Sequence, residues 1–168
     1  LHIASGAIAL LLGLVLIGDL FRQRFPKWRR RLGRLQVVGV LMFVTPSGLW
    51  MAYYAEAGPI AALGFALLAI VTAACLAIGW RAAVNRRFSE HRRWMMRGFL
   101  LLCSAVVIRI LGGLATVMGF HAEWFDQLTP WICWLAPLLA YEWISGTTNF
   151  AARTSFPRRR VSRDAERA

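Results

Sequence analysis

The sequence is short of acidic residues and of charged residues in general. Charged residues make up 17% of the 168 positions, and eight of them are Asp or Glu against twenty Lys or Arg. Apolar residues make up 58%, above the roughly 45–50% of a soluble domain. This composition excludes an ordinary soluble globular protein. The formal net charge of +12 indicates either an anionic partner or basic loops that set the topology of a membrane protein.

Cysteine is also scarce, and the motifs of catalysis are missing. Cys75, Cys103 and Cys133 each lie inside an apolar run with no C-x-x-C spacing, so they are expected to be buried apolar side chains. The sequence has no nucleophile paired with a base, no phosphate-binding glycine-rich loop and no H-E-x-x-H. A soluble type of active site has no support, and the interpretation leans towards a protein that is not an enzyme.

Long apolar runs dominate what is present. They cover residues 1–21, 35–55, 60–83, 95–120 and 129–149, each long enough for the roughly 20 residues that cross a 30 Å hydrocarbon core. Because lipid offers no partner to backbone groups and no alternating strand pattern occurs, each run is predicted to be a helix. The predicted fold is all-α: a polytopic bundle of five transmembrane spans over 1–155, followed by a basic disordered tail at 156–168.

The basic residues are grouped between or after these runs. Nineteen of the twenty fall in three segments, 22–34, 81–97 and 153–167. Because a Lys and Arg excess in short flanking loops sets orientation, these segments and the C-terminus are predicted to be cytoplasmic, in a bacterial inner (plasma) membrane. The two other loops carry acidic residues and no Lys or Arg. The basic segments are therefore expected to meet anionic lipid headgroups, with no nucleic-acid partner.

One basic residue lies inside an apolar run. Arg109 follows Arg97 by twelve residues, which places it roughly 18 Å into the membrane. A charge near the midplane costs at least about 2.5–3.5 kcal/mol and must find a partner in the bundle interior. Glu142 precedes Arg153 by eleven residues, so it falls at nearly the same depth and is the predicted partner.

Three hydroxyl side chains, Thr45, Ser47 and Thr72, are predicted to reach the same layer and to complete a polar midplane cluster with Arg109 and Glu142. Pro46 removes a backbone donor and is expected to disturb the helix near Met42. The cluster is either a proton-relay, ligand or cofactor site, or a structural ion pair. A small-residue face on the fourth span would let another helix approach, and it comprises Ala105, Arg109, Gly112, Gly113 and Thr116.

The histidines give a second candidate site. His2 and His121 both fall at outer helix ends, where they could bind a metal, whose identity stays unknown, or ligate a haem b. Ordinary interfacial histidines occupy such positions too. Beside the third histidine, His91, Ser89 is expected to cap the fourth helix and Glu90 to favour its positive end. This cytoplasmic motif is given a structural role, and it comprises His91, Arg92, Arg93 and Trp94.

Several stretches resemble those of one family. They are HI at 2–3, PKWRRRLGR at 26–34, PSGL at 46–49, HRRWMMR at 91–97, RIL at 109–111 and CWLAP at 133–137. Over nearly the whole chain the sequence resembles bacterial predicted membrane proteins of unknown function (domain of unknown function 2306). The resemblance implies a further helix before Leu1, and thus six spans with both termini cytoplasmic. Members commonly carry a His in the first cytoplasmic loop, where this sequence has Trp28.

Three functions are compatible with these features. The leading hypothesis is a non-catalytic scaffold or accessory subunit of a larger inner-membrane complex, because it requires only helix packing and topology. The second is a haem- or quinone-binding redox membrane protein that uses His2, His121 and the layer of Arg109 and Glu142. The third is a small proton-coupled carrier, which would need a discontinuous helix at the midplane.

The predicted ion pair can be tested by a double-mutant cycle. Arg109→Met should strongly lower thermal stability in detergent, because it leaves the charge of Glu142 buried without its partner. Adding Glu142→Gln should restore much of that stability, since the double variant buries no lone charge. Full stability of Arg109→Met alone would contradict the pairing.

Overall fold

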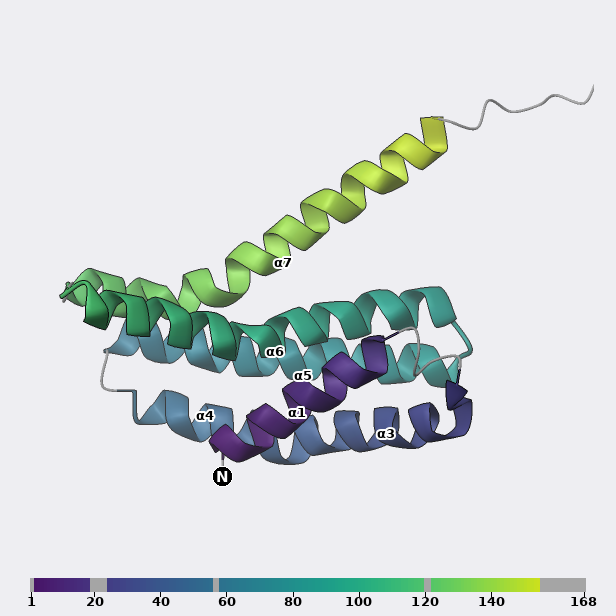
Figure 1. Cartoon of the computed structure of the whole chain (residues 1–168), viewed down its shortest axis with the longest axis horizontal. Helices are drawn as coiled ribbons and strands as arrows, with labels where there is room; N and C mark the ends of the chain where they lie inside the picture. The colour runs from purple at the N-terminus through teal and green to yellow at the C-terminus, as the bar shows by residue number, and fades with distance from the viewer. Residues whose placement is uncertain (1, 19–23, 56–57, 120–121, 155–168) are drawn as a thin grey trace, which may run out of the picture. The chain divides into compact units, whose positions relative to one another are not determined.

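The computed structural model describes residues 2–18, 24–55, 58–119 and 122–154, and these residues form helices joined by short turns (Figure 1). The chain divides into two units, Leu1–Leu138 and Leu139–Ala168, with the division inside the last helix. The helices are α1 (His2–Ile17), α3 (Pro26–Gly39), the π-helix η1 (Val40–Val44), α4 (Thr45–Tyr53), α5 (Pro59–Val84), α6 (Phe88–Val117) and α7 (Glu123–Thr154).

The described helices are those of a membrane protein. Three stretches are long and apolar enough to cross a bilayer, Lys27–Tyr53, Pro59–Val84 and Phe88–Val117, and a shorter apolar helix covers Ala4–Ile17. Their outward surfaces carry large apolar side chains such as Met42, which is 66% exposed, and lipid accepts such side chains where water would not. The all-α membrane fold is confirmed, and the count of five spans stays a prediction.

Helices begin earlier than the apolar runs predict. The structure starts α3 at Pro26, α6 at Phe88 and α7 at Glu123, six to nine residues before the predicted span starts. Arg and Lys are good helix formers, so the basic segments before the second and fourth apolar runs, taken as loops, continue α3 and α6 out of the apolar layer. Pro26 suits the first turn of α3, because the backbone N–H that proline lacks has no partner there.

The cap predicted for α6 is wrong. Arg87, and not Ser89, is the N-cap residue, and α6 has no side-chain cap hydrogen bond. Glu90 does lie in the first turn, and its carboxylate is 3.6 Å from the Arg87 guanidinium. Both side chains are exposed, so this pair contributes little to stability.

Pro46 is accommodated by the π-helix η1. Proline has no N–H, and its ring conflicts with the carbonyl four residues earlier, here that of Met42. The preceding turn widens, and the N–H of Thr45 bonds to the carbonyl of Val40, five residues back. The Ser47 hydroxyl donates to the carbonyl of Phe43. The disturbance predicted near Met42 is thus confirmed, and it leaves α3, η1 and α4 as one continuous run of helix.

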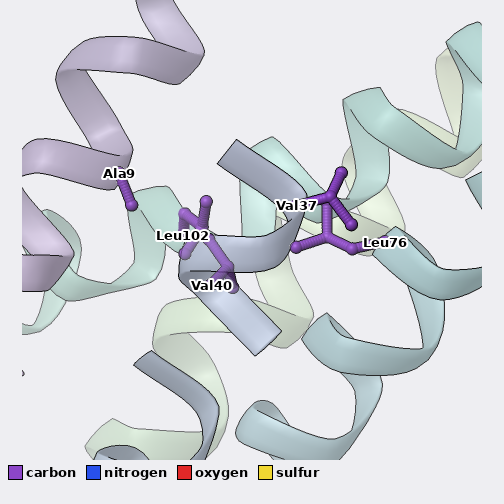
Figure 2. Close-up of a cluster of buried hydrophobic side chains, with 5 residues drawn as sticks. All are labelled: Ala9, Val37, Val40, Leu76 and Leu102. Atoms are coloured by element: carbon purple, nitrogen blue, oxygen red, sulfur yellow. The ribbon is translucent and has the colours of Figure 1, made fainter. Parts of the chain in front are cut away.

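Within the unit Leu1–Leu138, α5 and α6 lie side by side at the centre (Figure 1). Leu76 of α5 and Leu102 of α6 pack with residues of α1, α3 and η1 (Figure 2). The neighbouring residues Cys75 and Leu101 pack instead with Cys133 and Trp134 of α7. Successive residues on a helix point about 100° apart, so the α5–α6 pair presents one side to α1 and α3 and another to α7.

Two glycines let α5 and α6 approach closely. A Cβ atom added to Gly98 of α6 would lie 2.9 Å from Leu76 Cδ2, and one added to Gly79 of α5 would lie 2.9 Å from Met95 Sδ. Contacts that short do not occur between real Cβ atoms and their neighbours. Leu76 is only 2% exposed and cannot move aside without disturbing the core around it.

Gly98→Ala is expected to destabilise the protein by about 1–3 kcal/mol, because the added methyl group overpacks against Leu76. The matched control is Gly33→Ala in α3, where an added Cβ meets nothing within 4 Å. That variant should be neutral or gain about 0.5–1 kcal/mol from helix propensity. Thermal unfolding in detergent measures both, and equal stability of the two variants would contradict the close approach at Gly98.

Candidate functional site

The two ends of the first unit differ in charge. α3 and α6 begin, and α5 ends, at what we call the basic end, which carries the described Lys and Arg residues of 24–34 and 81–97. At the opposite end α7 begins with Glu123 and Asp126 in its first turn. Arg109, on α6, lies between the two ends. Two of the three basic segments predicted from the sequence therefore lie at one end of the first unit, and the side chains of the third segment, 153–167, and the predicted tail 156–168 lie outside the described residues.

The motif at the basic end joins α6 to α5. The His91 Nδ1–H donates to the carbonyl of Gly79 on α5 at 2.8 Å, and the side chain of His91 is half-buried. The guanidinium of Arg97 lies 4.5 Å from the ring centroid of Trp94, a cation–π contact. Arg92 and Arg93 are exposed. In this arrangement His91 fastens two helix ends together, as expected of a structural residue.

Arg109 lies on an exposed part of α6. Its Nη1 donates to the carbonyl of Ala105, one turn back on the same helix, at 3.2 Å. Glu142 lies in the second unit, Leu139–Ala168, and Arg109 lies in the first. The ion pair between them stays a prediction.

The three hydroxyl residues of the predicted cluster lie on two different helical runs. Thr72 is buried in α5 and donates to the carbonyl of Leu68 at 2.7 Å. Ser47 donates to backbone carbonyls of its own helical run. The Oγ1 of Thr45 is buried and has no hydrogen-bond partner among the described residues. Thr72 is thus satisfied by its own helix, and Thr45 is the member with unused hydrogen-bonding capacity.

The small-residue face of α6 is open within the first unit. A Cβ added to Gly112 or Gly113 meets nothing within 4 Å, and Arg109 and Thr116 on the same face are exposed. This differs from Gly98 on the same helix, which a neighbouring side chain contacts. Within the first unit no neighbouring group fills the space beside these two glycines, and the docking of another helix on this face stays a prediction.

The histidine site lies largely outside the described residues. His121 is not among them, and of His2 only the backbone is described, as the start of α1. Among the described side chains, no group of three or more His, Cys, Asp or Glu residues could hold a metal ion. The haem and metal hypotheses for His2 and His121 stay predictions.

The structure buries an amide side chain that was not predicted from the sequence. Gln36 of α3 is 5% exposed, and its Nε2 donates to the carbonyl of Ala9 on α1 at 2.7 Å. Its Oε1 is buried with no partner within the described part of the chain. A single uncharged polar residue at the start of an apolar run was the available signal, because an amide in lipid must find a partner. Gln36 holds α1 against α3.

His91→Ala should lower the free energy of unfolding by about 0.5–1.5 kcal/mol, because it removes the hydrogen bond that joins α6 to α5. Arg92→Ala, in the same turn and exposed, is the matched control and should leave stability unchanged. Thermal unfolding in detergent measures both. Two variants of the same stability would show that the contact between His91 and Gly79 does not stabilise the fold.

Comparison with known proteins yields a family and no described activity. No curated protein and no solved structure matches the chain. One family does match, described as "Predicted membrane protein (DUF2306)", and the match covers residues 1–144. These residues include all of the first unit, with its apolar helices and its basic end. The chain belongs to the DUF2306 family of predicted membrane proteins, whose function is unknown.

Proposed function

We propose that the chain is a non-catalytic scaffold or accessory subunit of a complex in a bacterial inner membrane. It would cross the membrane five times, with the basic end and the C-terminus in the cytoplasm. The observation that carries the proposal is the open small-residue face of α6, the face of Gly112 and Gly113. In lipid, helices associate through close van der Waals packing at small residues, because the hydrophobic effect does not drive them together.

The use of glycine elsewhere in the chain supports this role. Gly64 of α5 is contacted by Trp131, Gly79 by Met95 and Gly98 by Leu76. Each of these glycines marks a place where two elements of this chain pack closely. Gly112 and Gly113 have the same helical setting and no such neighbour within the first unit. A helix of a partner subunit would use them as α5 and α6 use Gly79 and Gly98.

The charge distribution supports the proposed orientation. The Lys and Arg residues of 24–34 and 81–97 gather at one end of the bundle, and the first turn of α7 at the opposite end is acidic. An excess of basic residues favours the cytoplasmic side. At that side they would attract anionic lipid headgroups, each contributing about 1 kcal/mol near the surface.

The two other hypotheses have weaker support. A carrier would need a discontinuous helix at the midplane, whereas η1 keeps α3 and α4 continuous through Pro46. The redox hypothesis depends on His2 and His121, whose side chains lie outside the described residues, so it stays a prediction. The scaffold role requires only helix packing and membrane topology, and no ligand or moving helix.

A bulky residue on the open face should block assembly. Gly113→Leu is expected to remove at least nine-tenths of the partner protein that co-purifies with the affinity-tagged chain from its native membrane, because a helix could no longer approach α6 closely. Gly39→Leu on α3, where an added Cβ also meets nothing within 4 Å, is the matched control and should retain the partner.

Chemical cross-linking in intact membranes before solubilisation gives the same comparison without detergent. Unchanged co-purification and cross-linking by Gly113→Leu would contradict the proposal. So would a wild-type protein that is monomeric and free of partners in both measurements.

A further inference from the structure

The first half of α7 is fixed on α5 at the end opposite the basic end. The indole Nε1–H of Trp131 donates to the carbonyl of Ile60 at 3.0 Å. A Cβ added to Gly64 would lie 3.0 Å from that Nε1 and 3.2 Å from the Cβ of Pro130. The absence of a side chain at Gly64 therefore lets α7 lie directly on α5, and the indole anchors it there.

Beside this contact, α5, α6 and α7 leave a cavity open to the surface. Its volume is about 460 Å³, within the range of small-molecule sites. It exists partly because Gly112 of α6 has no side chain, and a Cβ added there would meet nothing within 4 Å. The walls include Phe65, Ile108, Gly112, Phe125, Asp126 and Thr129, all in the first unit.

The walls are apolar and aromatic except at one side. Thr129 already donates its hydroxyl hydrogen to the carbonyl of Phe125 at 2.6 Å. Asp126 is the one charged side chain among the described residues that line the cavity, and it is exposed. Arg109, one turn from Gly112, directs its Nη1 to the carbonyl of Ala105, towards the basic end. Among the residues that line the cavity, the charge is therefore the negative charge of Asp126.

We propose that this cavity binds a lipophilic organic cation, with the positive charge beside the Asp126 carboxylate and the apolar body against Phe65, Ile108 and Phe125. Each feature of the walls would favour the binding of such a molecule. The carboxylate attracts its charge, the two phenyl groups favour a cation as well as an apolar group, and the body displaces lipid or water from apolar walls. An anion of the same shape would gain only the last of these. This inference goes beyond the proposed scaffold role and is tested on the purified chain, without a partner; in an assembled complex, a partner helix packed on Gly112 would compete with the cation for the same space.

The probe is tetraphenylphosphonium, and its charge control is tetraphenylborate, an anion of nearly the same shape. Binding is measured by equilibrium dialysis to the full chain purified in a neutral detergent. We expect saturable binding of the cation and at least tenfold weaker binding of the anion. Equal binding of the two ions would overturn the proposal, because it would mean that only apolar contact matters.

Two variants locate the site. Asp126→Asn should weaken cation binding about tenfold, since it removes one charge of a close ion pair near the surface. Glu123→Gln, which neutralises the other carboxylate in the first turn of α7, is its matched control and should bind like wild type. Gly112→Leu should abolish binding by filling the cavity, and Gly39→Leu should not. Wild-type binding by Asp126→Asn would overturn the proposal even if Gly112→Leu failed to fold.

A lipid with an amine headgroup is the competing occupant. The same binding measurement is made with the chain in nanodiscs of phosphatidylethanolamine and in nanodiscs of phosphatidylglycerol. Binding of tetraphenylphosphonium in both, weakened by Asp126→Asn in both, supports a free organic cation as the ligand. Loss of binding in phosphatidylethanolamine alone would overturn the proposal and assign the cavity to the lipid headgroup.

Discussion

The close contact between α5 and α6 is the constraint on which the first unit depends. Gly98 and Gly79 bring the two helices so near that side chains of one fill the space left by the glycines of the other. This sets the direction of Leu76 and Leu102 towards α1 and α3, and of their neighbours towards α7. In lipid, where apolar burial alone does not hold helices together, shape complementarity of this kind is what fixes the other helices in place.

Most polar side chains described in the apolar layer donate a hydrogen bond to a backbone carbonyl of their own helix. Thr72 and Ser104 donate to carbonyls three or four residues back on their own helices, and Arg109 does the same. Such bonds satisfy the side chain but do not hold a neighbouring helix in place. Gln36 differs, because its amide reaches the carbonyl of Ala9 on another helix. It therefore contributes to the arrangement of helices, and a buried Oε1 without a described partner is the cost of that position.

The sequence predicted the class of fold because long apolar runs separated by grouped basic residues are typical of helical membrane proteins and rare in soluble ones. It also located the disturbance at Met42, since the effect of Pro46 on its own helix is local. It did not predict the starts of α3 and α6, because Arg and Lys fit a helix that leaves the membrane as well as they fit a loop. Of the candidate site, the sequence identified an α6 face on which Gly112 and Gly113 have no close neighbour within the first unit. It could not show which glycines have a side chain of another helix packed against them. Gly98 and Gly112 differ only in what the rest of the fold places beside them.

That difference between glycines bears on where function can reside in the bundle. A glycine with a side chain packed against it is needed for the fold, because a larger residue at that position would overpack and destabilise the protein. A glycine without such a neighbour could be replaced without overpacking within the first unit. Its small size is then either incidental or serves a contact outside that unit. Gly112 lies both on the open face of α6 and in the wall of the cavity beside Asp126. The end of the bundle opposite the basic end therefore combines free space, aromatic walls and a carboxylate, Asp126, in the cavity wall. The basic end is occupied by its own contacts, with His91 bonded to Gly79 and Arg97 placed over Trp94.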